Sequence, residues 1–391
     1  MDKRTIAINT PYERPDAYGA LSVPIYNNVA FEFADAAEMA DAFCNRINAP
    51  DYSRVENPTV TNLELRVRNL TNANSVAAFN SGMAAISNTL LATLKQGSEI
   101  VTSNHLFGNT LTLVSTTLAR FGVKARLTDL TDLQEVEQAL NDKTACVFLE
   151  AVTNPQLEIA DVEAISRLAH AKGIPVIIDS TAIPFTHNRL RELGVDIEVL
   201  SSTKYLSGGG TSLGGLVIDY GTFPGIMKRI KTELLFNFGA YMTPQTAYMQ
   251  TLGLETLHVR YERQSANALH IAKELRNIKG IKQVNYIGLP DNPFHSLATK
   301  QFGGEAYGAM ITIELGSKQE CFNTLNRLKL THRATNLFDN RTLAIHPAST
   351  IFGLFSEEKL KEIDVKQTTI RLSIGLEDPT DIINDIKQAL E

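Results

Sequence analysis

The chain has few cysteines, no cluster of basic residues and no long apolar run. Its three cysteines, Cys44, Cys146 and Cys321, lie far apart and form no CxxC pair, which argues against a disulfide framework or a zinc module. We expect them to be core residues of a protein in a reducing compartment. The net charge is −6 and the basic residues are spread along the chain, so no nucleic-acid partner is expected.

Membrane, metal and hydrolase signals are also missing from the sequence. The first twenty residues contain no apolar h-region, and acidic residues interrupt the apolar runs before they could span a bilayer. We therefore expect a cytoplasmic protein without membrane partners. The eight histidines form neither HxxxH nor a Ser-His-Asp pattern, so no metal site is predicted, and His346 in "AIHPAST" is as well explained as a buried structural residue.

The composition is that of an ordinary globular protein, with 43% hydrophobic and 20% charged residues in 391. Between about residues 60 and 220, short β-branched runs alternate with amphipathic stretches, a pattern typical of βα units and a mostly parallel sheet. The expected strands are "SVAAF", "EIVTS", "ACVFLEAV", "PVIIDST", "IEVLSS" and "GGLVID". Helices are expected between them, for example over residues 81–97 and 160–173.

Beyond this region the pattern predicts a long helix over residues 244–275, followed by a smaller α/β domain that ends in a helix. About the first 55 residues show little periodicity and are expected to form an extended arm. The predicted organisation is an arm (1–58), a large domain (59–250) and a small C-terminal domain (251–391).

Two polar residues follow neighbouring predicted strands. Asp179 closes "PVIID", and Lys204 follows "IEVLSS". Ligands of parallel α/β sheets collect at the carboxyl ends of the strands, so both residues could face one ligand. An acid beside a pyridine nitrogen and an amine that forms a Schiff base are the pair needed by a pyridoxal cofactor. Taken alone, Asp179 could equally cap a turn, and Lys204 could be a solvated surface lysine.

Phosphate could be held at the start of the helix that opens with Ser81, Gly82 and Met83, because free N–H groups and the helix dipole favour an anion there. Ser201 and Thr203 could add hydroxyl donors. Ser81 could also be only an N-cap. The glycines of "SGGGTSLGG" suggest a nucleotide loop only weakly, because the lysine precedes them and no GxxxxGK[ST] follows.

Together these stretches resemble one family, the transsulfuration enzymes of cysteine and methionine metabolism, which use pyridoxal 5′-phosphate (PLP). The resemblance runs from "VPIYNN" to "RLSIGLEDPTDI" and is carried by "YSRVENPT", "FNSGMAAI", "FLEAVTNP", "VIIDST", "SSTKY", "GLETLHVRYERQSANA" and "IRLSIGLED". It implies the fold type I of PLP-dependent transferases, which is aspartate aminotransferase-like, with a mostly parallel central sheet and a smaller C-terminal α/β domain.

The resemblance also implies roles for individual residues. Lys204 would bind the cofactor covalently, and Asp179 would pair with the pyridine nitrogen. The other expected cofactor-binding residues are Ser81, Gly82, Met83, Phe107, Asn154, Thr181, Ser201 and Thr203, together with Tyr52 and Arg54, which would reach the phosphate of a neighbouring subunit. Arg371, with Asn336 beside it, would bind the substrate carboxylate, although on its own Arg371 would more simply be a surface arginine on an edge strand. A homotetramer, built as a dimer of dimers, is expected.

Several positions depart from the family pattern. The ring-stacking tyrosine is Phe107, which keeps the aromatic face and lacks the phenol, so a proton-transfer role would be absent or pass to Tyr52 or Lys204. The cysteine typical of methionine γ-lyases is Asn109. Two family histidines are replaced by Gly209 and Phe352.

The C-terminal motif "NLFDNRTLAIHPAST", residues 336–350, resembles that of the homoserine-ester sulfhydrylases, with Phe338 in place of a glycine. Lyases and cystathionine synthases usually show "SLGGxESL". The predicted reaction is therefore γ-replacement on an activated homoserine, O-acetylhomoserine first, with sulfide or a thiol giving homocysteine or methionine and acetate. The alternatives are a γ- or β-lyase acting on cystathionine or methionine, a cystathionine γ-synthase, or a non-catalytic phosphate or nucleotide binder.

Overall fold

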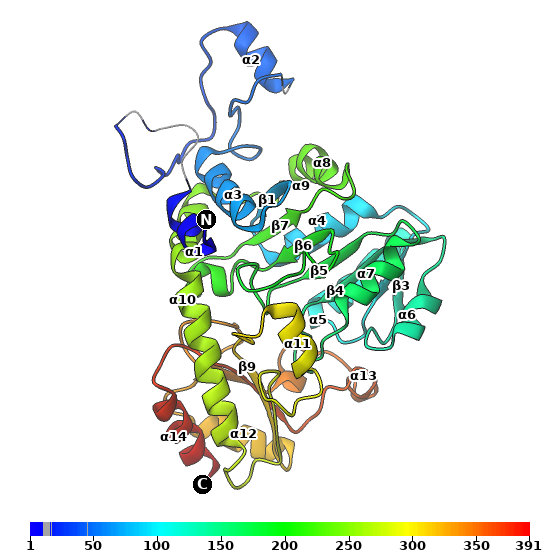
Figure 1. Ribbon diagram of the computed structural model, residues 1–391, viewed down its shortest axis with the longest axis vertical. Helices are drawn as coiled ribbons and strands as arrows, with labels where there is room; N and C mark the ends of the chain where they lie inside the picture. Colours follow the sequence, from blue (N-terminus) through cyan, green and yellow to red (C-terminus); the bar gives the residue numbers. More distant parts are fainter. Residues whose placement is uncertain (11–15, 17, 45) are drawn as a thin grey trace.

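A central seven-stranded sheet dominates the computed structural model, which describes residues 1–10, 16, 18–44 and 46–391 (Figure 1). The strand order is β1-β7-β6-β5-β4-β2-β3. Strands β2 to β6 run parallel to one another, whereas β7 is antiparallel to both β6 and β1. The bounds are β1 (Ser75–Phe79), β2 (Glu99–Thr102), β3 (Lys124–Leu127), β4 (Thr144–Glu150), β5 (Val176–Asp179), β6 (Ile197–Leu200) and β7 (Gly215–Asp219). The sheet is thus mostly parallel, as predicted.

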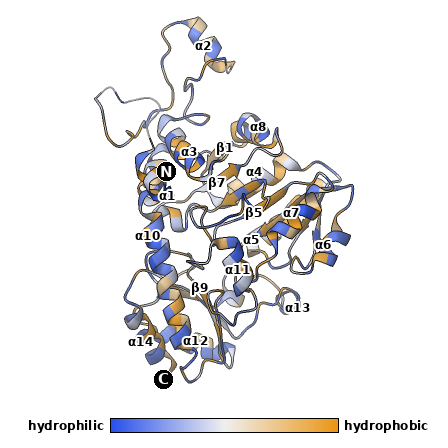
Figure 2. Cartoon of the chain, in the orientation of Figure 1, coloured by the Kyte–Doolittle hydropathy of each residue, from blue (hydrophilic) through white to orange (hydrophobic). Residues whose placement is uncertain are grey.

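Both faces of this sheet are buried except along the edge strand β3, which explains why most of its strands are apolar without alternation. On β4, Val147 and Leu149 belong to one hydrophobic cluster, and Cys146 and Phe148 belong to another. Successive side chains of a strand point to opposite faces, so each cluster fills one side. The covering helices are α3 (Pro58–Thr71), α4 (Gly82–Thr93), α5 (Gly108–Thr112), α6 (Leu133–Ala139), α7 (Val162–His170), α8 (Ile226–Arg229) and α9 (Leu235–Phe238). Figure 2 shows hydrophobic strands at the centre and hydrophilic outer turns on helices such as α6 and α7.

Helix α10 (Pro244–Leu275) joins the central sheet to a second, smaller sheet (Figure 1). Its start is fixed by Thr243, whose hydroxyl accepts a hydrogen bond from the Thr246 N–H, and by Pro244 in the first turn. The second sheet has the order β10-β11-β12-β9-β8, and β12 lies antiparallel between β11 and β9. Its elements are β8 (Gln283–Asn285), α11 (His295–Phe302), β9 (Met310–Glu314), α12 (Lys318–Arg327), β10 (His332–Arg333), β11 (Leu343–Ile345), α13 (Glu357–Glu362), β12 (Thr369–Ser373) and α14 (Pro379–Leu390).

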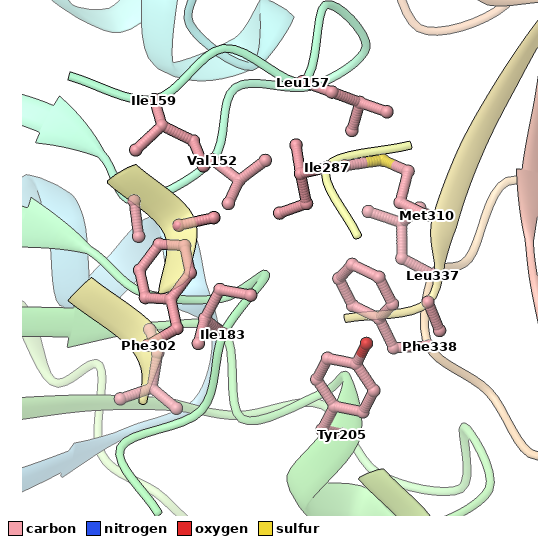
Figure 3. Packing of buried hydrophobic residues seen from close by; sticks show 14 of the residues in the cluster. Val152, Leu157, Ile159, Ile183, Tyr205, Ile287, Phe302, Met310, Leu337 and Phe338 are labelled. Atoms are coloured by element: carbon pink, nitrogen blue, oxygen red, sulfur yellow. The ribbon is translucent and has the colours of Figure 1, made fainter. Parts of the chain in front are cut away.

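The two sheets share one hydrophobic cluster at their junction. Figure 3 shows Ile183 next to Phe302 on one side of the cluster, and Met310, Leu337 and Phe338 on the other. The Phe338 ring stacks on the Tyr205 ring with 4.2 Å between centroids and 9° between planes. Tyr205 opens a 3₁₀ turn directly after Lys204, so this stacking braces the lysine loop.

The N-terminal region is more structured than the expected extended arm. Helix α1 (Lys3–Asn9) packs against α3 and α10, and α2 (Ala36–Phe43) projects away from the sheets (Figure 1). Asp2 and Asp35 cap these helices, and such short capped turns carry little hydrophobic periodicity. The predicted domain limits at residues 58 and 250 remain predictions.

Other expectations also need correction. Strand β3 was not predicted, because "KARL" has no apolar run. The expected 81–97 helix ends at Thr93, short of Gly97. Cys146 and Cys321 are buried as expected, but Cys44 is exposed at the end of α2. No described helix has the length and apolarity needed to cross a bilayer.

Gly253 offers a test of how α10 supports the lysine loop. A Cβ at this position would lie 1.9 Å from the Leu206 carbonyl oxygen. In an exposed helix Gly→Ala stabilises by up to about 1 kcal/mol, but here overpacking should dominate and Gly253→Ala should cost about 1–3 kcal/mol. We expect a lower melting temperature by calorimetry.

The reverse exchange at Ala266, an exposed position of the same helix, is the control for helix propensity. Ala266→Gly should cost up to about 1 kcal/mol through propensity alone. If the Leu206 contact were unimportant, Gly253→Ala would raise the melting temperature by about as much as Ala266→Gly lowers it.

Candidate active site

A cavity of about 1040 Å³ opens at the carboxyl ends of β4, β5 and β6. Residues of the second sheet, including Arg371 on β12, complete its wall. The predicted site residues that line it are Ser81, Gly82, Met83, Phe107, Asn154, Asp179, Thr181, Ser201, Thr203, Lys204, Asn336 and Arg371. The structure thus gathers residues that are scattered over most of the chain.

One end of the cavity is the first turn of α4. The Ser81 hydroxyl accepts a hydrogen bond from the Ala84 N–H at 3.1 Å, so Ser81 does act as an N-cap. A Cβ on Gly82 would lie 2.6 Å from the Ser201 Cβ, so only glycine allows this close approach. The free N–H groups of the first helical turn and the nearby hydroxyl of Ser201 form a cradle suited to a phosphate.

The two threonines near this cradle already have backbone partners. The Thr203 hydroxyl donates to the Gly214 carbonyl at 3.2 Å and accepts from the Gly214 N–H at 3.0 Å. The Thr181 hydroxyl accepts from the Ser201 N–H at 2.8 Å. Both side chains therefore fix the loops that carry Ser201 and Lys204, whatever else they bind.

Asp179 and Glu150 end the paired strands β5 and β4 and lie opposite each other. Burial raises the pKa of Asp179, and hydrogen bonds from Thr181 oppose this shift. Burial and the neighbouring Asp179 charge raise the pKa of Glu150 well above its usual value, although the Phe107 N–H donates to Glu150 at 2.7 Å. Two adjacent buried carboxyl groups do not both ionise easily, so Glu150 holds the proton and Asp179 keeps the charge for a cation in the cavity.

Glu150 was not singled out from the sequence, although it lies in the quoted motif "FLEAVTNP". Its position at the end of a predicted strand, next to the strand that ends in Asp179, was the available signal. By accepting a hydrogen bond from the Phe107 N–H, Glu150 fixes the backbone that carries the aromatic ring lining the cavity.

Lys204 lines the same cavity as the carboxyl pair, and Asn336 holds its side chain. The lysine Nζ donates to the Asn336 Oδ1 at 2.8 Å, and the Asn336 amide donates to the Asp339 carboxylate at 3.2 Å. Burial, and then the positive charge of Arg371, lowers the pKa of Lys204 to about 8, while Asp339 opposes the shift. A lysine in this state is a much better nucleophile and base than a surface lysine. The alternative that Lys204 is a solvated surface lysine is therefore wrong.

Arg371 occupies the middle of β12 with 2% of its surface exposed, so it is not a surface arginine on an edge strand. It donates to the Asn154 Oδ1 at 3.1 Å and to the Thr335 carbonyl at 3.5 Å, and burial lowers its pKa to about 9. Among the described residues its Nε has no hydrogen-bond partner and no carboxylate forms an ion pair with it. A buried guanidinium without a counter-ion favours an anionic ligand. Its parallel N–H donors match the two oxygens of a carboxylate.

The glycine run after Lys204 has a different use from a nucleotide loop. Gly208 and Gly210 adopt positive φ angles, and a Cβ on Gly210 would lie 2.3 Å from the Asp339 carboxylate. Asn340 and Arg341 donate hydrogen bonds to the carbonyls of Gly208 and Gly209. The glycine run therefore packs against the 336–341 loop and accepts hydrogen bonds from it. The alternative that these glycines form a nucleotide-binding loop is not supported.

Tyr52 and Arg54 stand apart from the other predicted site residues. Tyr52 is 42% exposed, Arg54 lies 5.4 Å over its ring, and neither lines the cavity of its own chain. Arg54 donates instead to the Phe236 carbonyl. Their expected reach into a neighbouring subunit remains a prediction.

The groups that line the cavity fit a pyridoxal phosphate. The Gly82 cradle suits the phosphate, the carboxyl pair suits the ring nitrogen, and Lys204 suits the aldehyde. The unpaired Arg371 Nε leaves a place for the carboxylate of an amino acid.

Comparison with known proteins agrees with this fit. The profile of the Cys/Met metabolism PLP-dependent enzymes matches residues 4–391. An L-methionine gamma-lyase of Fusobacterium nucleatum is 39% identical over 378 residues, which cover 96% of this chain and 94% of the relative. An O-acetyl-L-homoserine sulfhydrylase of Corynebacterium glutamicum is 34% identical, with 94% and 92% covered.

A solved structure from Campylobacter jejuni, named as an O-acetylhomoserine (thiol)-lyase, superposes with a TM-score of 0.96 at 34% identity and covers all of both chains. Its active-site lysine is present as N′-pyridoxyl-lysine-5′-monophosphate. The chain therefore belongs to the PLP-dependent enzymes of cysteine and methionine metabolism.

Proposed function

We propose that the protein catalyses γ-replacement on O-acetylhomoserine, with sulfide or a small thiol as the incoming group. In this reaction the bond between Cγ and the ester oxygen breaks, acetate leaves with the electron pair, and the thiol sulfur bonds to Cγ. The observation that carries an amino-acid substrate is Arg371, a buried cation with an unpaired Nε at the cavity wall. Its fork would hold the substrate carboxylate.

The preference for replacement rests on the 336–341 loop. Asn336 stands where lyases usually show serine, and its side chain contacts the Lys204 Nζ. Asp339 adjoins Asn336, and Arg341 donates to Asp339. The loop that differs between the two groups of enzymes therefore touches the group that we propose to move protons.

The proposed roles follow from charge and position. When bound, PLP supplies an electron-accepting ring next to the substrate Cα. Asp179 would keep that ring's nitrogen protonated, and the α4 N-terminus with Ser201 would hold the phosphate. Lys204 would hold the cofactor and would accept the proton from the substrate Cα at its Nζ and deliver it elsewhere along the substrate. Phe107 would offer the ring an aromatic face and no proton-transfer group.

A γ-lyase is the second candidate, favoured by the methionine gamma-lyases among the relatives. Both reactions share the first half, up to loss of the γ-substituent. They differ in the final reactant, which is a thiol in γ-replacement and water in the lyase reaction. Asn109, in the place of the cysteine typical of methionine γ-lyases, lines the cavity and supports the replacement reaction.

We also propose a cytoplasmic homotetramer in which Tyr52 and Arg54 complete the phosphate site of a neighbouring subunit. Large apolar side chains are exposed along the N-terminal region, which a partner subunit would cover. They include Tyr18, Leu21, Val29, Met39 and Phe43. The unpaired cysteines suit a reducing compartment.

A substrate panel tests the reaction directly. Purified holoenzyme should release acetate from O-acetylhomoserine much faster with sulfide than without it, and homocysteine should form in equal amount. O-Succinylhomoserine, cystathionine and methionine are the comparison substrates. Release of 2-oxobutyrate from methionine or cystathionine, without added thiol and at a rate similar to replacement, would refute the proposal in favour of a γ-lyase.

The role of Arg371 predicts a specific kinetic effect. Arg371→Gln removes a charged pair with the substrate carboxylate and should lower kcat/KM about 10- to 100-fold, mainly by raising KM. Arg371→Lys keeps the positive charge but lacks the planar guanidinium, so its kcat/KM should lie between those of the wild type and Arg371→Gln. Unchanged KM in Arg371→Gln, with the cofactor absorbance retained, would exclude the carboxylate role.

The pKa of Lys204 predicts how fast the cofactor attaches at different pH values. The neutral amine is the nucleophile, so the attachment rate to cofactor-free protein should rise with pH and level off above about 8, well below the ordinary lysine value of 10.5. In Arg371→Gln the inflection should move to higher pH, because a nearby positive charge is lost, whereas Arg371→Lys should leave it in place. Absorbance of the lysine-bound cofactor follows the rate, and a wild-type rate still rising near pH 10 would contradict the assignment.

A further inference from the structure

Three metal-binding side chains meet outside the cavity. His187 comes from the loop after β5, and His258 and Glu262 lie one turn apart on α10, close to the start of α1 (Figure 1). One ligand atom from each residue lies within 4.8 Å of the other two. None of the three lines the cofactor cavity. We call them the α10 histidine site.

The spacing of these atoms suits a single ion. The Glu262 Oε1 lies 3.0 Å from the His258 Nε2 and 4.0 Å from the His187 Nε2. Ligands of a tetrahedral zinc ion, each about 2.0–2.2 Å from the metal, lie about 3.4 Å apart, midway between these two values. The rings of His187 and His258 stack with 4.4 Å between centroids and 25° between planes, so both side chains would rotate to turn their Nε2 atoms onto one ion.

His187 is a buried side chain with an unused ring nitrogen. Its side chain is 7% exposed, and its Nε2 has no hydrogen-bond partner in the part of the chain that the structure describes. Its Nδ1 lies 2.8 Å from the Thr186 hydroxyl. Donation from Nδ1–H to this oxygen leaves a lone pair on Nε2, which lies 4.0 Å from the Glu262 Oε1, as in metal sites whose second ring nitrogen is fixed by an oxygen acceptor.

The charges around the site permit a cation. Two positive side chains lie near the site, and both have partners. The Lys3 ammonium donates to the carbonyls of Phe185 and Thr186 at 3.2 and 3.3 Å. Arg4, which interacts electrostatically with Glu262, forms an ion pair with Asp2 at 2.9 Å. Burial, together with His258 and Lys3, lowers the pKa of His187 to about 3, so its ring is in the neutral form that binds metals. Glu262 supplies the negative charge.

We propose that His187, His258 and Glu262 bind one Zn²⁺ ion per chain, with water in the remaining coordination position. Two imidazoles and one carboxylate suit Zn²⁺, whereas Mg²⁺ and Ca²⁺ prefer oxygen ligands throughout. The ion would clamp the loop after β5 to α10. His187 also contacts the Tyr261 ring, and Tyr261 contacts Tyr205, the residue after Lys204. The site would thus brace the lysine loop from behind, whichever reaction the enzyme catalyses.

Zinc titration of the metal-free holoenzyme by calorimetry tests this proposal. We expect one Zn²⁺ per chain, and His258→Asn and Glu262→Gln should each weaken binding more than about a hundredfold, since even the outer partners of metal ligands account for 10–100-fold. The zinc absorption edge should show nitrogen and oxygen ligands at about 2.0–2.1 Å. Added Zn²⁺ should raise the melting temperature of the wild type and leave that of both variants unchanged.

His270 and Glu274 provide a matched control, because they have the same spacing on the exposed face of α10. His270→Asn and Glu274→Gln should bind Zn²⁺ like the wild type. The proposal fails if the wild type binds no stoichiometric zinc, if His258→Asn and Glu262→Gln bind as tightly as the wild type, or if the control variants weaken binding equally. Equal melting temperatures of all variants without zinc would show that any loss of affinity is not a loss of folding.

Discussion

The separation of charge inside the cavity is the constraint on which the site depends. Arg371 and Lys204 are cations withdrawn from water, and the Glu150–Asp179 carboxyl pair lines the same cavity. No direct ion pair joins the two groups among the described residues, so the buried charges are not neutralised by one another. Such an arrangement costs stability in the empty protein and favours a ligand that carries both an anionic carboxylate and a ring cation.

The fold draws Arg371 and the carboxyl pair from two different sheets. Asp179 and Glu150 end parallel strands of the central sheet, where strand termini meet at one edge. Arg371 comes from the middle of β12 in the second sheet, flanked by β11 and β9. The hydrophobic cluster at the junction, with Phe338 stacked on Tyr205, fixes the distance between the two walls. Catalytic geometry therefore depends on packing that carries no charge.

The sequence predicted those parts of the fold that local patterns determine. The β1 run and the Pro244–Leu275 helix were placed at their observed bounds, because apolar spacing and a proline start are local signals. Asp179 and Lys204 were found because both follow strand patterns. Strand β3 was missed, because its short run has a mixed composition and is stabilised by pairing with β2.

Contacts between distant segments could not be predicted in the same way. The hydrogen bond from Lys204 to Asn336 joins segments far apart in the chain, and the strand pairing that places Glu150 opposite Asp179 does the same. Nor could the sequence show that Arg371 is buried, because the same β12 run is compatible with an edge strand or a central one. His187 near His258 is a similar case, since only the fold brings the loop after β5 against α10.

The loop after Lys204 shows why these distant contacts matter for function. Two segments hold it from different directions. Helix α10 approaches it closely at Gly253, and the 336–341 loop donates hydrogen bonds to Gly208 and Gly209 and stacks Phe338 on Tyr205. The close approach, the hydrogen bonds and the aromatic stack together leave little room for displacement. A lysine that must hold a cofactor and then move protons needs a fixed backbone and a free side chain. This structure supplies the first through contacts with α10 and the 336–341 loop, and the second through a hydrogen bond from the Lys204 Nζ to Asn336, which a ligand can replace.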